Sequence, residues 1–454
     1  MLSYLLAGDH GIPLTLIETS DYDRWFDEQS EPLQNWLTCT DYKGKGISLI
    51  PGEEGVMGQV IVGVEDLSSH FICGDLVNQL PAGDYKLQGD ENLLKLAAFS
   101  WGLGAYQFNR YKKTDQKECP RLILPSQAQV EEAEKYVKAV ASVRDLVNTP
   151  AGDMMPEHLG EAVAKLAEEF GGKVSQIVGD ELLAQNYPTI HAVGRASSHA
   201  PRLIDMTWGD EKHPLITLVG KGVCFDSGGL DMKGSAGMRL MKKDMGGAAH
   251  VIGLARLIMD FNLPVRLRML IPAVENAVAG NALRPGDVVK TRQGLTVEIH
   301  NTDAEGRLVL CEALTEASAE NPEMIVDFAT LTGACRIALG TEVGGFYTDD
   351  TALACELMQA GDKTEDPVWR LPLHKGYKYM LKSEIADMTN CAREPYGGSI
   401  TAALYLQDFV GKDIPWVHFD IMAWNIRNQP GRPVGGEAFG VRAMFEVLLD
   451  RYGH

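Results

Sequence analysis

Four acidic side chains and a lysine occur in this sequence at places where they are able to hold cations. They are Lys221 and Asp226, which follow the apolar run Leu215-Ile216-Thr217-Leu218-Val219, Asp244, which precedes an apolar helical pattern, and the pair Asp303 and Glu305. Four carboxylates neutralise two divalent ions, which is the charge balance of a two-metal site. Lys221 joins such a site only as a neutral amine, a form that burial beside cations favours.

The stretch Asn301-Thr302-Asp303-Ala304-Glu305-Gly306-Arg307-Leu308 is the most informative one. In an extended segment Asp303, Glu305 and Arg307 share one face, and Ala304 and Gly306 share the other. The small residues let the backbone approach a cation cluster closely. We therefore predict that the two carboxylates bind the same cations.

Each of these residues also has a purely structural interpretation. Lys221 is a possible surface-turn lysine, Asp244 a helix cap, and Asp303 and Glu305 a solvated acidic loop. Three other chemistries lack their motifs: the glycine spacing of a phosphate loop, an H-E-x-x-H zinc site, and a serine elbow, which requires glycine where Phe225 precedes Asp226-Ser227. His250 and His418 are interpreted as core histidines.

The elements that must position these residues alternate between strand and helix. We predict helices at 156–170, 246–260 and 307–318, strands at 215–219, 265–271 and 324–329, and a pair of strands over 287–300 about the Arg292-Gln293-Gly294 turn. This alternation is typical of a layered α/β domain with a mostly parallel sheet, in which sites form beyond the carboxyl ends of the strands. A smaller α/β domain over 1–120, a connecting helix over 121–145 and a catalytic domain over 146–454 complete the expected organisation.

Composition excludes several classes of protein. The formal net charge of −20 opposes binding to a phosphate backbone, so nucleic acid is not expected as a partner. The eight cysteines form no C-x-x-C pair and are expected to be reduced, mostly buried thiols. The N-terminus lacks the basic region of a secretory signal, and no apolar run is long enough to span a membrane. We expect a cytoplasmic protein.

Three motifs resemble those of the leucyl aminopeptidases, a family of dinuclear cytosolic exopeptidases, over roughly residues 140–445. They are Val219-Gly220-Lys221-Gly222-x-x-Phe225-Asp226-Ser227-Gly228-Gly229, Met241-x-x-Asp244-Met245-Gly246-Gly247-Ala248-Ala249 and Asn301-Thr302-Asp303-Ala304-Glu305-Gly306-Arg307-Leu308. The resemblance implies an aminopeptidase that removes N-terminal residues from peptides with a free α-amine.

The resemblance also implies roles for single residues. One ion, Zn²⁺ or Mn²⁺, is held by Asp226, Asp303 and Glu305, and a second by Lys221, Asp226, Asp244 and Glu305. A hydroxide that bridges the ions attacks the peptide carbonyl, and Lys233 binds the carbonyl oxygen and stabilises the resulting diolate. Arg307 is always protonated and cannot act as a base, so the family places a bicarbonate on it to carry the proton.

The pocket for the first side chain is implied to include Met241, Thr330 and Gly333, with the Leu331 carbonyl near the substrate amine. Met422 departs from the family pattern, since it stands where the family has a pocket alanine, and a reshaped pocket is expected. The family forms hexamers, so a homohexamer acting on short peptides is implied.

Three alternatives remain at the level of sequence. They are a DNA-binding or regulatory protein on the same scaffold, a retired enzyme acting as an assembly scaffold, and a narrow dipeptidase such as one acting on cysteinylglycine. The acidic net charge disfavours the first, and the presence of all five metal-binding residues disfavours the second.

Overall fold

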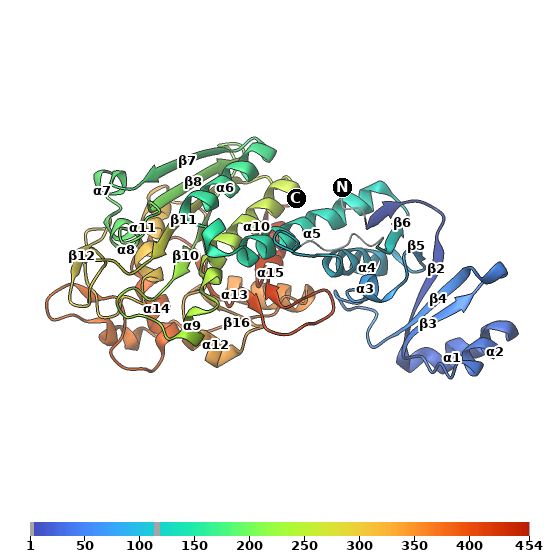
Figure 1. Cartoon of the computed structure of the whole chain (residues 1–454). Helices are drawn as coiled ribbons and strands as arrows, with labels where there is room; N and C mark the ends of the chain where they lie inside the picture. The colour runs from blue at the N-terminus through green and yellow to red at the C-terminus, as the bar shows by residue number, and fades with distance from the viewer. Residues whose placement is uncertain (1–3, 113–118, 454) are drawn as a thin grey trace. The chain divides into compact units, whose positions relative to one another are not determined.

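The computed structural model describes residues 4–112 and 119–453, which form two compact units (Figure 1). The smaller unit is Met1–Ala141 with Arg427–Val434, and the larger is Ser142–Ile426 with Gly435–His454. Residues 1–3, on which part of the expectation about a secretory signal depends, lie outside the described residues. No helix in the described part of the chain is long and apolar enough to cross a membrane.

The smaller unit is built on a six-stranded sheet. Its strands are β1 (Leu5–Ala7), β6 (Arg121–Leu124), β5 (Asp84–Leu87), β2 (Ile12–Glu18), β4 (Met57–Val64) and β3 (Gly46–Pro51), in that spatial order. All neighbours pair in parallel except β3 with β4. Residues 121–124 were predicted to begin a connecting helix, and this was wrong, because they form the buried strand β6. The helix, α5 (Gln127–Asn148), begins after it.

Helices cover both faces of this sheet because its strands are apolar on both faces. Leu16 and Val62 pack with α4 (Glu91–Gly104) and α3 (Leu76–Gln79). Ile17 and Ile61, one residue away in each strand, pack instead with Leu37 of α2 (Glu31–Cys39) and with residues of α1 (Tyr22–Asp27). Successive side chains of a strand point to opposite faces, so each strand contributes to two cores.

The larger unit is a layered α/β domain, as predicted. Its main sheet runs β16 (Val368–Arg370), β15 (Gly344–Tyr347), β18 (Trp416–Asp420), β14 (Met324–Ala329), β9 (Leu215–Gly220), β11 (Arg266–Asn276), β8 (Arg202–Trp208) and β7 (Lys173–Val178), with β10 (Gly222–Asp226) paired to β11. The central strands β18, β14, β9 and β11 are parallel, and β10 is parallel to β11. Their carboxyl ends therefore meet at one edge.

Two helical layers enclose this sheet. α10 (Gly246–Asp260) contacts β9 and β14, and it packs with α6 (Pro156–Phe170) and α15 (Val441–Tyr452), which contacts α13 (Thr351–Lys363). On the other side α11 (Gly306–Ala319) contacts β9 and β11 and packs with α8 (Pro188–Gly194) and α14 (Gly398–Gln407) (Figure 1). β14 is buried at every residue, as a strand covered on both faces must be.

The remaining elements are short. A small sheet contains β12 (Val288–Lys290), β13 (Thr296–Glu298) and β17 (Met388–Thr389), and a hairpin pairs β19 (Trp424–Asn425) with β20 (Gly435–Gly436). The helices α7 (Glu181–Ala184), α9 (Ser235–Met238) and α12 (Gly333–Leu339) and the 3-10 segment Met241–Met245 complete the larger unit. Four cysteines, Cys73, Cys224, Cys311 and Cys335, are buried, but Cys39, Cys119 and Cys355 are exposed, so the expectation of mostly buried thiols was only partly right.

Candidate active site

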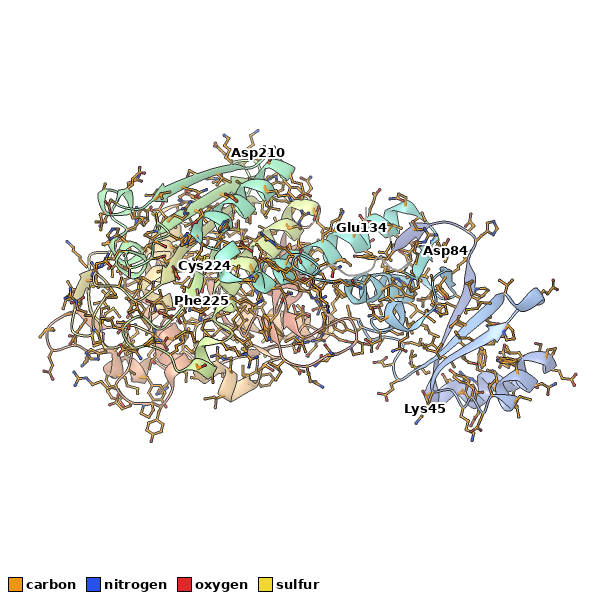
Figure 2. The ribbon with its side chains drawn as sticks, viewed as in Figure 1. Lys45, Asp84, Glu134, Asp210, Cys224 and Phe225 are labelled. Atoms are coloured by element: carbon orange, nitrogen blue, oxygen red, sulfur yellow. The ribbon has the colours of Figure 1, made fainter. Side chains whose placement is uncertain are left out.

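Several candidate residues lie at the carboxyl ends of neighbouring parallel strands. Lys221 follows the last residue of β9, Asp226 ends β10, and Thr330 follows β14. Cys224 and Phe225, labelled in Figure 2, mark β10 immediately before Asp226. The carboxyl ends of adjacent parallel strands share an edge, which is where sites are expected in such sheets.

Lys221 is the buried centre of this cluster. Its Nζ lies 2.7 Å from Asp244 Oδ2 and 3.0 Å from Glu305 Oε1, and it donates to the Thr330 carbonyl at 3.2 Å. Burial lowers the pKa of Lys221, but the surrounding carboxylates outweigh it and raise that pKa above its ordinary value. The surface-turn interpretation is therefore wrong. A Cβ on Gly306 would lie 2.5 Å from Lys221 Cε, so only glycine leaves room for this side chain.

Asp244 is not a helix cap. It lies in the 3-10 segment before α10, where the N-cap position belongs to Met245. Its carboxylate instead accepts a hydrogen bond from Thr330 Oγ1 at 2.7 Å and pairs with Lys221. Although burial opposes ionisation, the positive charge of Lys221 keeps the pKa of Asp244 below its ordinary value.

Carboxylates from three segments converge here. One oxygen each of Asp226, Asp244 and Glu305 lies within 4.8 Å of the others, and all three residues are buried. Asp303 is partly exposed and joins the cluster through Lys233, whose Nζ lies 2.8 Å from Asp226 Oδ2 and also contacts Asp303.

Glu305 carries the clearest sign of a cation-binding site. Burial, reinforced by the Asp226 carboxylate, raises the pKa of Glu305 to about 8. Its Oε2 is buried and has no hydrogen-bond partner among residues 4–112 and 119–453. A buried carboxylate oxygen without a donor is costly unless a cation binds it, so the donor set fits hard or borderline divalent ions.

The segment around Glu305 is not the extended strand that was predicted. Thr302 and Asp303 lie in a turn, and α11 begins at Gly306, so Arg307 belongs to the first helical turn. Arg307 is buried, and its Nε and Nη1 have no hydrogen-bond partner in the part of the chain that the structure describes. Burial lowers the pKa of this guanidinium from its ordinary value.

The residues expected to contact the substrate lie beside the cluster. Met241 and Thr330 are buried, Leu331 is partly exposed, and Gly333 is exposed at the start of α12. Lys233 is predicted to contact the carbonyl oxygen and lies between Asp226 and Asp303. The structure thus brings Lys221, Asp244, Glu305 and Thr330 into contact, and it joins Asp226 and Asp303 through Lys233.

Two supporting residues were missed by the sequence analysis. Asn276 ends β11 and donates from Nδ2 to Asp226 Oδ1 at 2.8 Å and to the Thr302 carbonyl at 3.1 Å. Asp420 ends β18, and its carboxylate accepts four hydrogen bonds, from Leu331 N, Thr332 N, Thr332 Oγ1 and Ser399 Oγ. Both are polar residues at the carboxyl end of an apolar strand, a signal that was available in the sequence.

The two histidines belong to the core, as expected. His250 Nδ1 lies 2.6 Å from the Gly246 carbonyl, its Nε2 accepts from Phe439 N, and burial lowers its pKa to about 4. His418 Nδ1 lies 2.6 Å from Asp327 Oδ1, and although burial lowers the pKa of His418, this carboxylate raises it overall.

Comparison with known proteins decides the family. Residues 141–445 match the catalytic domain of the cytosol aminopeptidase family, and residues 12–125 match the M17 aminopeptidase N-terminal domain. This chain belongs to the cytosol aminopeptidase family. It is a metal-dependent aminopeptidase that acts on peptides, and the family likeness extends to the N-terminal part as well.

Three individual relatives support this family assignment. The aminopeptidase is 48% identical to the cytosol aminopeptidase of Coxiella burnetii, with a TM-score of 0.95 over 99% of both chains. It is 40% identical to a probable cytosol aminopeptidase of Syntrophotalea carbinolica, over 76% of this chain and 73% of that one. The bottromycin maturation enzyme BotP, solved in complex with Mn, is 31% identical, with a TM-score of 0.87 over 97% of this chain and 99% of that one. All are enzymes, which disfavours the DNA-binding and scaffold alternatives.

Replacing Asp420 by alanine should destabilise the aminopeptidase. The backbone N–H groups of Leu331 and Thr332 would lose their shared acceptor, at a cost of about 1–3 kcal/mol for each buried donor left unpaired. Denaturant unfolding measures the loss. Ser399→Ala, which removes only one of the four donors, should cost less, and equal stability of Asp420→Ala and the unmodified protein would contradict this role.

Proposed function

We propose that this aminopeptidase binds two divalent ions through Lys221, Asp226, Asp244, Asp303 and Glu305. The donor-free oxygen of Glu305 is the observation that carries the proposal. The cluster contains four carboxylates but only two lysine ammonium groups, so its net charge is negative. Lys221 can itself bind an ion once it loses its proton. Zn²⁺ or Mn²⁺ suits this set, and the related BotP was solved with Mn.

The bound ions supply Lewis-acid polarisation of the peptide carbonyl and activation of water. The chain's own residues orient the substrate. Lys233, held between Asp226 and Asp303, is placed to donate to the carbonyl oxygen as negative charge develops there. The turn held by Asp420 fixes the Leu331 carbonyl, which accepts from the substrate's α-amine, and Met241, Thr330 and Gly333 surround the first side chain.

We propose that Arg307 holds an anion. The family resemblance implies that this anion is a bicarbonate. Two of its buried guanidinium nitrogens are donors without an acceptor in the described residues, and an anion would satisfy both. Because Arg307 keeps its own proton, the anion and not the arginine would carry the proton from water to the leaving amine.

The domain boundaries, the cellular location and the assembly are also proposals. We propose a small domain that extends through β6, a linker formed by α5 and a catalytic domain after it, in a cytoplasmic protein. A homohexamer is proposed from the family resemblance, and light scattering should give a molar mass about six times the 49.6 kDa of one chain. A mass of one chain would contradict it.

Metal removal and addition test the function directly. Metal-stripped protein should not hydrolyse aminoacyl amides, and adding Zn²⁺ or Mn²⁺ should restore turnover of substrates with a free amine but not of their N-acetylated counterparts. Equal turnover of the N-acetylated substrates would contradict an aminopeptidase. Metal analysis of the restored protein should give two ions per chain.

Variants separate metal binding from catalysis. Glu305→Ala should lose bound metal and activity together, because it removes one of the carboxylates that would hold the ions. Lys233→Ala and Arg307→Ala should keep two ions while kcat falls by about 10²–10³-fold, since each acts on the substrate or on the proton transfer. Full turnover by Glu305→Ala would overturn the assignment. Added bicarbonate should stimulate the unmodified enzyme but not Arg307→Ala.

A further inference from the structure

A second buried lysine lies beside the proposed pocket and takes no part in the chemistry above. Lys243 is 1% exposed, and its Nζ has no hydrogen-bond partner within the described ranges of the chain. The nearest carboxylate oxygen with an ion-pair contact, Asp244 Oδ1, is 4.0 Å away and already accepts from Thr330 Oγ1 at 2.7 Å. A buried ammonium without a close partner is costly, so such a group indicates a ligand.

A guanidinium lies close to the same pocket. Arg336 belongs to α12, and its Nη2 would lie 3.5 Å from a Cβ placed on Gly333, one of the pocket residues. Among the described residues Arg336 has no ion pair or hydrogen bond through its side chain. Lys243 Nζ lies 4.0 Å from Asp244 Oδ1, which accepts from Thr330, another residue of the proposed pocket. Both cations therefore border residues of that pocket.

Among the described residues, the two carboxylates that adjoin the pocket residues are already occupied. The two carboxylate oxygens of Asp420, which holds the turn of Leu331 and Thr332, already accept four hydrogen bonds. The Asp244 carboxylate is shared between Lys221 and Thr330. An acidic group brought by a ligand would supply what both cations lack, and a guanidinium beside a carboxylate binds it with two parallel hydrogen bonds.

We propose that Lys243 and Arg336 bind the first side chain of the substrate, so that the enzyme prefers peptides beginning with glutamate or aspartate. This inference rests on the proposed function, because it uses the pocket of Met241, Thr330 and Gly333. It names the substrate class of that pocket and agrees with the expectation that Met422 reshapes it.

Paired isosteric substrates test the preference. Glutamyl and glutaminyl amides with the same leaving group differ in one charge and hardly in size. For the metal-loaded enzyme kcat/KM should favour the glutamyl substrate by about tenfold or more, the range that a charge-assisted hydrogen bond gives. A ratio of one or less, with leucyl and glutaminyl amides turned over, would overturn the preference and leave the aminopeptidase intact. No turnover of any free-amine substrate would overturn both.

Three substitutions locate the determinant. Lys243→Met and Arg336→Met should each move the ratio toward one, and the double variant should move it furthest. Lys242→Met is the matched control, because Lys242 donates to the Asn148 carbonyl at 2.6 Å and should leave the ratio unchanged. Arg336 is only partly buried, so Arg336→Met should fold even where Lys243→Met does not. An unchanged ratio in folded Arg336→Met would exclude its role.

Discussion

The burial of opposite charges at one edge of a parallel sheet is the constraint on which the rest of the structure depends. Removing an ion from water costs several kcal/mol, and only close opposite charges offset that cost. Lys221 meets this condition between Asp244 and Glu305, and Lys233 meets it between Asp226 and Asp303. The cluster still holds more negative than positive charge, and a donor-free Glu305 oxygen lies within it. Bound cations would neutralise this excess of negative charge.

The surrounding chain keeps this arrangement rigid. Asn276 at the end of β11 holds one oxygen of Asp226, and Asp420 at the end of β18 holds the turn that carries Leu331. Both supports come from strand ends, so the sheet that collects the charged residues also fixes their orientation. The turn after β14, which carries Leu331, is therefore connected to Lys221 through buried backbone.

The proposed preference for an acidic first residue follows from the same balance of buried charges. In the part of the chain that the structure describes, the Asp244 and Asp420 carboxylates are occupied by other donors, whereas Lys243 and Arg336 keep unused ones. An apolar first residue would leave both cations unsatisfied, and an acidic one would satisfy them. The ions determine the reaction, and these two cations would determine which peptide enters it.

Local sequence patterns determined much of this protein. The apolar runs gave strand 215–219 and helix 246–260 with nearly correct bounds, and the three motifs carried the family and its metal-binding residues. Other features depended on contacts between distant segments. Asp244 had the pattern of a cap, residues 121–124 were assigned to a helix, and Lys221 had the pattern of a surface-turn lysine; burial and partners decided otherwise. Periodicity reports the solvent exposure of one element at a time. The partners of a buried charge come from distant segments, as Thr330 does for Lys221 across 109 residues, and only the folded chain brings them together.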